Sequence, residues 1–145
     1  ETVLANESFV IPKGYECQWH QYGYLRKLYV ISEHPMESIP DVNSDTGIIK
    51  LQANRTCWEQ KQVQYQDTKG RFVAGVEQHK AMDISQTKTK NHLFVYLKSG
   101  ALTLTEDSGT VHNFKPSEAF FIPAGTSCSW HASLPLIRHF VEITP

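Results

Sequence analysis

Short stretches of apolar and β-branched residues recur along the chain, and turn sequences separate them. No stretch shows a sustained helical period of apolar positions. Turn sequences such as Pro12-Lys13-Gly14 and Glu106-Asp107-Ser108-Gly109 divide the stretches. The pattern predicts an all-β sandwich or barrel. Strands are expected at Ser8 to Ile11, Glu16 to His20, Leu25 to Ile31, Gly47 to Leu51, Phe72 to His79, Leu93 to Leu97, Ala101 to Thr105 and Ala119 to Ile122.

An internal repeat predicts how the chain is divided. The stretch ESFVIPKGYECQWH (residues 7–20) returns as EAFFIPAGTSCSWH (residues 118–131), and residues 25–31 return at 137–143 after a shift of one position. The offset of about 111 residues is one domain length, which indicates duplicated domains rather than a solenoid. We therefore expect residues 1–31 to be the C-terminal half of a first unit and residues 47–145 to be a complete second unit.

Residues 32–46 are predicted to form a linker between these two parts. They contain Pro35 and Pro40 among Glu, Ser, Asp and Asn, with few apolar residues. A short turn is possible at Met36 to Ile39.

Composition excludes several classes of function. The 145 residues carry a net charge of −1, and the basic residues are scattered, so no nucleic-acid surface is predicted. No apolar run is long enough to span a membrane, and Glu1 to Glu7 lack the pattern of a signal peptide, so we expect a soluble protein. Three widely spaced cysteines do not predict a disulfide framework, which favours a cytoplasmic setting.

The second half of the chain resembles the cupin superfamily. Residues 91–104 are similar to the end of the first cupin motif, and residues 114–125 are similar to the second motif. Trp130 followed by Ile137-Arg138-His139-Phe140 resembles the branch that contains ureidoglycine aminohydrolase and the ethanolamine-utilisation cupins. The resemblance implies an RmlC-like jelly roll, a double-stranded β-helix, and the repeat then implies a bicupin whose first barrel is truncated.

The strand after the turn Pro123-Ala124-Gly125 has two different faces. Residues two positions apart share a face of a strand, so Cys128 and Trp130 point to one side and Ser129 and His131 to the other. Phe120 and Ile122 are expected to supply core side chains in the same way. Cys128 and His131 are therefore not expected to form a catalytic dyad.

The resemblance also places the four usual cupin metal ligands, at Thr87, Thr89, Leu93 and Cys128. Two hydroxyls, an apolar side chain and one thiol do not make a divalent metal site, so we predict a degenerate site without metal or cofactor.

A displaced metal site that draws on Glu77, His79, His92 or His112 remains open. Glu77 and His79 share a strand face, and a hydrogen-bonded couple is the favoured interpretation of that pair.

A metal-free epimerase would need a histidine base and a tyrosine acid, for which His79, His92 and Tyr96 are candidates. Because the resemblance points Leu93 inward, His92 and Tyr96 are expected to face away from the barrel interior.

The favoured function is the binding of a small molecule in a pocket formed by Thr87, Thr89, Leu93, Cys128 and Trp130. An indole offers a flat apolar platform with one donor, although Trp130 could equally fill the core. Two alternatives stay open, a cupin enzyme of nitrogen or small-amide metabolism and a non-catalytic assembly module. Unpaired N-terminal strands would favour a homodimer through residues 1–31.

Overall fold

The computed structural model describes residues 1–32, 47–54, 56 and 58–145. None of these residues is helical, so the described chain has no helix that could cross a membrane. The all-β fold class is confirmed. The strands are β1 (Ser8–Val10), β2 (Ile49–Leu51), β3 (Gln60–Gln66), β4 (Phe72–His79), β5 (Met82–Lys88), β6 (His92–Ser99), β7 (Leu102–Glu106), β8 (Val111–Phe114), β9 (Ala119–Ile122), β10 (Ser127–Ala132) and β11 (Leu136–Ile143).

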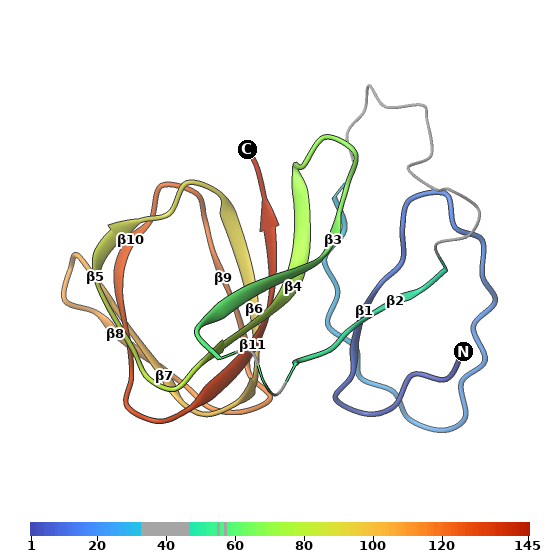
Figure 1. Cartoon of the computed structure of the whole chain (residues 1–145), viewed down its shortest axis with the longest axis horizontal. Coiled ribbons are helices and arrows are strands. Elements are labelled where there is room, and N and C mark those ends of the chain that lie inside the picture. The colour runs from blue at the N-terminus through green and yellow to red at the C-terminus, as the bar shows by residue number, and fades with distance from the viewer. Residues whose placement is uncertain (33–46, 55, 57) are drawn as a thin grey trace.

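Two antiparallel sheets form a jelly-roll barrel. One sheet has the order β3-β4-β11-β6-β9 and the other the order β5-β10-β7-β8. The chain passes from one sheet to the other after β4, β5, β6, β8, β9 and β10, so most neighbouring strands, apart from β3–β4 and β7–β8, are distant in sequence. Figure 1 shows the two sheets facing each other, with the β1–β2 ribbon beside them.

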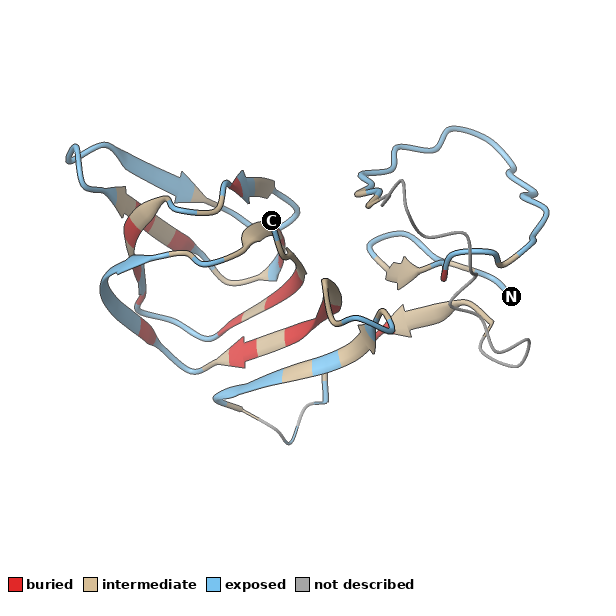
Figure 2. Cartoon of the chain, turned by 90° about the horizontal axis from the view of Figure 1, so that it is seen from above, coloured by how far each residue is buried: buried red, intermediate tan, exposed pale blue. Residues whose placement is uncertain are grey.

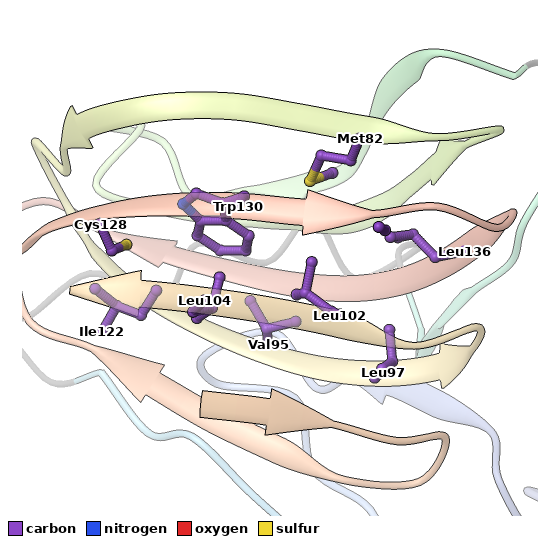
Figure 3. Packing of buried hydrophobic residues seen from close by; sticks show 10 residues of the cluster. Met82, Val95, Leu97, Leu102, Leu104, Ile122, Cys128, Trp130 and Leu136 are labelled. Carbon is purple, nitrogen blue, oxygen red and sulfur yellow. The ribbon is translucent and has the colours of Figure 1, made fainter. Parts of the chain in front are cut away.

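The barrel interior holds the main apolar core, which Figure 3 shows from close by. Cys128 and Trp130 on β10 are 2% and 6% exposed, whereas His131 is exposed, as the alternation of faces predicted. Ile122 is buried and Phe120 packs against the same cluster. The cluster consists of Met82, Val95, Leu97, Leu102, Leu104, Ile122, Cys128, Trp130, Ala132 and Leu136.

Three of the strands that the sequence analysis did not predict lie at sheet edges. β3, β5 and β8 carry mostly polar side chains and are largely exposed. An edge strand is held by backbone pairing to one neighbour and does not need a buried face, so its sequence lacks the alternation of apolar residues. By contrast, the ranges expected for β4 and β9 were correct.

The strands expected at Glu16 to His20 and Leu25 to Ile31 were wrong. Residues 11–31 contain no strand, and Figure 2 shows this segment exposed along most of its length. Their counterparts in the repeat are β10 and β11, which pair with β4, β5, β6 and β7. A strand without neighbours leaves its backbone groups unpaired, which explains why the same pattern does not form a strand here. The turn expected at Met36 to Ile39 lies outside the described residues.

The β1–β2 ribbon covers part of the outer face of the five-stranded sheet. Leu51 from β2 forms a second apolar cluster with Ala74 and Val76 from β4. Ser8 Oγ lies 2.6 Å from Nδ1 of His139, which is buried on β11. Burial, helped by the positive charge of Lys98, lowers the pKa of His139 to about 4.

Candidate functional site

Three of the five predicted pocket residues lie together in the barrel. Cys128 and Trp130 belong to the core cluster, and Leu93 packs against it. Thr87 pairs with Cys128 across β5 and β10, but its side chain is exposed. Thr89 follows the end of β5, beside the loop that contains Pro123.

The side chains at the ligand positions that the cupin resemblance implies do not fit a divalent metal. The hydroxyl of Thr87 donates to the carbonyl oxygen of Ser85 at 2.8 Å. The Thr89 hydroxyl lies 3.0 Å from the Pro123 carbonyl oxygen. Burial raises the pKa of the Cys128 thiol, which disfavours the thiolate that binds metals. Within the part of the chain that the structure describes, no group of three or more His, Cys, Asp or Glu side chains is placed to hold a metal ion.

Trp130 is packed against two other side chains rather than presented as an open platform. Its ring centroid lies 6.0 Å from that of Phe120, with the planes tilted by 54°. The guanidinium carbon of Arg138 lies 4.5 Å from the Trp130 ring centroid. Trp130 therefore fills the core and at the same time supports an arginine through a cation–π contact.

Arg138 occupies the middle of β11 on the face that points into the barrel. In strand register it lies opposite Glu77 on β4 and Leu97 on β6. Its Nε donates to Glu77 Oε2 at 2.6 Å, and its Nη2 donates to the same oxygen. The two side chains are 9% and 12% exposed, so this is a buried, charge-assisted pair. The remaining nitrogen, Nη1, is buried and has no hydrogen-bond partner among the described residues.

His79 lies two residues beyond Glu77 and shares its face of β4. Its Nε2 is 3.7 Å from Glu77 Oε2, too far for a hydrogen bond, and it too is buried without a partner in the described chain. The other ring nitrogen, Nδ1, lies 3.1 Å from Glu59 Oε2. We call Glu59, Glu77, His79 and Arg138 the interior polar cluster, of which Glu59 is the exposed end, with a side chain that is 52% exposed.

Glu59 orients the ring of His79. Its Oε1 accepts the backbone N–H of Lys80 at 2.6 Å. That bond, together with the hydrogen bond from His79, lowers the pKa of Glu59. An ionised carboxylate can only accept, so Nδ1 of His79 carries the proton that is shared with Glu59.

The sequence indicated part of this cluster. Glu77 and His79 were expected to form a hydrogen-bonded couple, but the structure joins each of them to a different partner, Arg138 and Glu59. The sequence did contain a signal that could have indicated the pair of Glu77 and Arg138. Each of these residues is charged and occupies an inward position of an otherwise apolar strand, and their charges have opposite signs. Glu59 could not be found in this way because it lies in the turn before β3, outside any apolar strand pattern.

The other histidine and tyrosine candidates lie outside the barrel. His92 stacks on the exposed ring of Phe121, with centroids 5.7 Å apart. Tyr96 faces Asn6, whose Oδ1 lies 3.3 Å from the phenol oxygen. The outward orientation of His92 and Tyr96 agrees with the prediction. His112 pairs on the surface with Glu106 at 2.7 Å.

Comparison with solved structures shows the fold. The chain is similar to a DUF861-family protein of unknown function from Pseudomonas syringae pv. tomato (15% identity, 68% of this chain and 48% of that chain, TM-score 0.57). It is also similar to a cupin-2 domain containing protein from Shewanella frigidimarina (10% identity, 60% of this chain and 82% of that chain, TM-score 0.52). The EutQ protein of Clostridium difficile matches at 19% identity over 51% of this chain and 57% of that chain, with a TM-score of 0.47. The chain thus spans about half the length of the Pseudomonas and Clostridium proteins.

A comparison with curated proteins found no match. The family model described as the EutQ-like cupin domain matches residues 66–140, which is just over half of the chain. That range runs from the end of β3 to the middle of β11 and includes Glu77, His79, Trp130 and Arg138. The chain belongs to the EutQ-like cupin domain family.

Proposed function

We propose that this cupin binds a small organic molecule in its barrel without a metal ion, beside Trp130 and the interior polar cluster. The observation that carries the proposal is the guanidinium of Arg138, buried against Trp130 with Nη1 unpartnered in the described chain. A buried donor without a partner costs about 1–3 kcal/mol, so a ligand atom that accepts this hydrogen bond gains affinity.

The pocket proposed from the structure and the pocket predicted from the sequence both include Trp130, but they extend from it in different directions. The expected pocket ran toward Thr87, Thr89, Leu93 and Cys128. The unpartnered polar atoms lie instead toward β4 and β11, where Glu77 holds the other edge of the guanidinium. Polar groups that converge beside an aromatic side chain are typical of small-molecule sites.

Two measurements test this function. Metal analysis of the purified protein is expected to find no stoichiometric Mn, Ni, Fe or Zn. A screen of a diverse fragment library by NMR is expected to find saturable binders that perturb the indole N–H of Trp130. Stoichiometric metal in the barrel, or a library without any such binder, would show that the proposal is wrong.

A catalytic role in nitrogen or small-amide metabolism is the second candidate. The resemblance of Trp130 and residues 137–140 to the ureidoglycine aminohydrolase branch supports it. So does the Glu59–His79 pair, because a carboxylate that orients an imidazole is a common device for proton transfer. The test is turnover of any binder from the screen, with loss of turnover in H79Q and unchanged turnover in H112Q. Equal turnover in wild type and H79Q would exclude His79 as the base.

A role in assembly rests on the exposed apolar residues of the N-terminal segment. Trp19 and Leu28 are 55% and 51% exposed, whereas their counterparts in the repeat, Trp130 and Phe140, are 6% and 1% exposed. Exposed apolar patches commonly mark interaction surfaces, and a homodimer through residues 1–31 is the form we propose. Light scattering is expected to give twice the chain mass, and W19S/L28S is expected to dissociate the dimer. A monomer at micromolar concentrations would contradict this role.

A further inference from the structure

The two unpartnered nitrogens of the interior polar cluster restrict the chemistry of the ligand. Arg138 Nη1 and His79 Nε2 are both buried, and neither has a partner in the described part of the chain. Both side chains also contact Glu77, through the guanidinium pair and through the 3.7 Å approach of His79. They therefore belong to one site. The inference that follows rests on the proposed function.

The Arg138 side of the site requires an acceptor. A guanidinium has five N–H donors and no acceptor, and here Nε and Nη2 are already used by Glu77. The guanidinium carbon lies 4.5 Å from the Trp130 ring centroid, so the group is held beside that ring. A ligand that satisfies Nη1 must bring an oxygen or another acceptor to that edge.

The His79 side requires a donor when the ring is neutral. Glu59 accepts from Nδ1, and its position is fixed in turn by the backbone N–H of Lys80. With the proton on Nδ1, Nε2 of a neutral ring has a lone pair and no hydrogen. A ligand that satisfies Nε2 must then supply an N–H or O–H group.

The charges of the cluster disfavour an ionised ligand. Arg138 and Glu77 neutralise each other at close range, and Glu59 adds a negative charge on the far side of His79. A ligand carboxylate would add a further negative charge beside Glu77, and a ligand ammonium would approach a guanidinium that is only 9% exposed. Neither a ligand carboxylate nor a ligand ammonium would therefore meet a charge of opposite sign that is not already paired within the cluster.

We propose that the interior polar cluster selects an uncharged polar group in which an acceptor oxygen, bound by Arg138, lies next to an N–H or O–H donor, bound by His79. Charged isosteres of the same group are rejected.

Three small probes that share an acetyl group test this selection on the wild-type protein. Acetamide carries both the oxygen and the donor, N,N-dimethylacetamide lacks the donor, and acetate replaces the donor with negative charge. Each is titrated to about 100 mM at about pH 8, where imidazoles are ordinarily neutral, because such small molecules bind at about millimolar strength at best. The shifts of the Arg138 Nε–H and Trp130 indole N–H signals are followed by NMR. We expect saturation with acetamide, at least about tenfold weaker binding of N,N-dimethylacetamide and no saturation with acetate.

Variants connect the selectivity to the two side chains. R138K keeps the positive charge without the planar donors, and H79F keeps a ring without its acceptor; each is expected to weaken acetamide binding about tenfold, followed by the Trp130 signal. H112Q is the matched control, since His112 also pairs with a glutamate but lies on the surface, and it should bind as the wild type does. If a variant fails to fold, the comparison of the three probes on the wild-type protein still tests the selectivity.

The inference is overturned if acetate binds more tightly than acetamide, if acetamide gives no saturable shift, or if R138K and H79F bind acetamide as the wild type does. Preferred binding of acetate beside Trp130 would leave the proposed function standing and remove only the selectivity. The proposed function fails separately, through stoichiometric metal or through a fragment library without binders.

Discussion

The buried pair of Arg138 and Glu77 makes a quantitative prediction about stability. Replacing Arg138 with Met leaves a carboxylate in the barrel, 12% exposed, without its cationic partner. Replacing Glu77 with Met leaves the guanidinium with three unpaired nitrogens, since Nε and Nη2 both depend on that carboxylate. Each single variant should therefore lose about 3 kcal/mol of unfolding free energy, and R138M also loses its contact with Trp130.

The double variant R138M/E77M should cost much less than the sum of the two single variants. Two apolar side chains of similar length leave no buried charge behind, and such replacements are often close to neutral. We expect a loss of no more than about 2 kcal/mol in the double variant, and a coupling energy of at least about 2 kcal/mol.

Urea unfolding followed by circular dichroism measures all four proteins, with coincident fluorescence transitions as the check of two-state behaviour. The matched control is the ion pair of Lys61 and Glu142 in the same sheet, whose side chains are 39% and 27% exposed. The corresponding cycle, K61M with E142M, should give a coupling of less than about 1 kcal/mol because solvent screens the pair. Additive losses in the Arg138–Glu77 cycle, each below about 1 kcal/mol, would refute the description of a buried pair.

Three further predictions concern other parts of the fold. A Cβ on Gly75 would lie 2.0 Å from a carbonyl oxygen of β3, so G75A should lose about 1–3 kcal/mol of unfolding free energy. Gly47 has open space around it, so the control variant G47A should lose almost none. Equal urea midpoints for G75A and G47A would contradict this prediction. Because the pKa of His139 falls from 6.5 to about 4 on folding, the unfolded chain binds more protons between these values. Stability should therefore decrease by about 3 kcal/mol as the pH falls from 6.5 to 4, and H139Q should lose that slope; an unchanged slope in H139Q would exclude His139 as its source. In a C57S background, a thiol reagent should modify exposed Cys17 quickly and Cys128 only after unfolding, because burial raises the pKa of the Cys128 thiol. Equal rates of modification of Cys17 and Cys128 in the folded protein would contradict the burial of Cys128.

Features of single strands could be predicted from the sequence. The alternation along β10 placed Cys128 and Trp130 inside and His131 outside, and the bounds of β4 and β9 followed from their apolar residues. The orientation of a side chain about its own strand is a local property with a period of two, so a short stretch is enough to determine it.

Edge strands and the N-terminal segment could not be predicted in this way. β3 and β5 are strands because a neighbour supplies backbone hydrogen bonds, although their own residues are polar. Residues 16–20 have the pattern of β10 and yet form no strand, since the pairing that β10 obtains from β5 and β7 has no equivalent there. In both cases the neighbours of a segment decided its structure, and its own residues did not.

The sequence by itself determined the fold class and the direction of the core side chains, and the cupin resemblance led to the prediction that Thr87, Thr89, Leu93 and Cys128 form no metal site. The tertiary structure alone decided that Arg138 meets Glu77, 61 residues away, and that Glu59 holds His79. The physical reason is register. Which inward side chains meet depends on how strands pair across the sheet, and a slip of one residue would turn Arg138 from the barrel interior to its outer face.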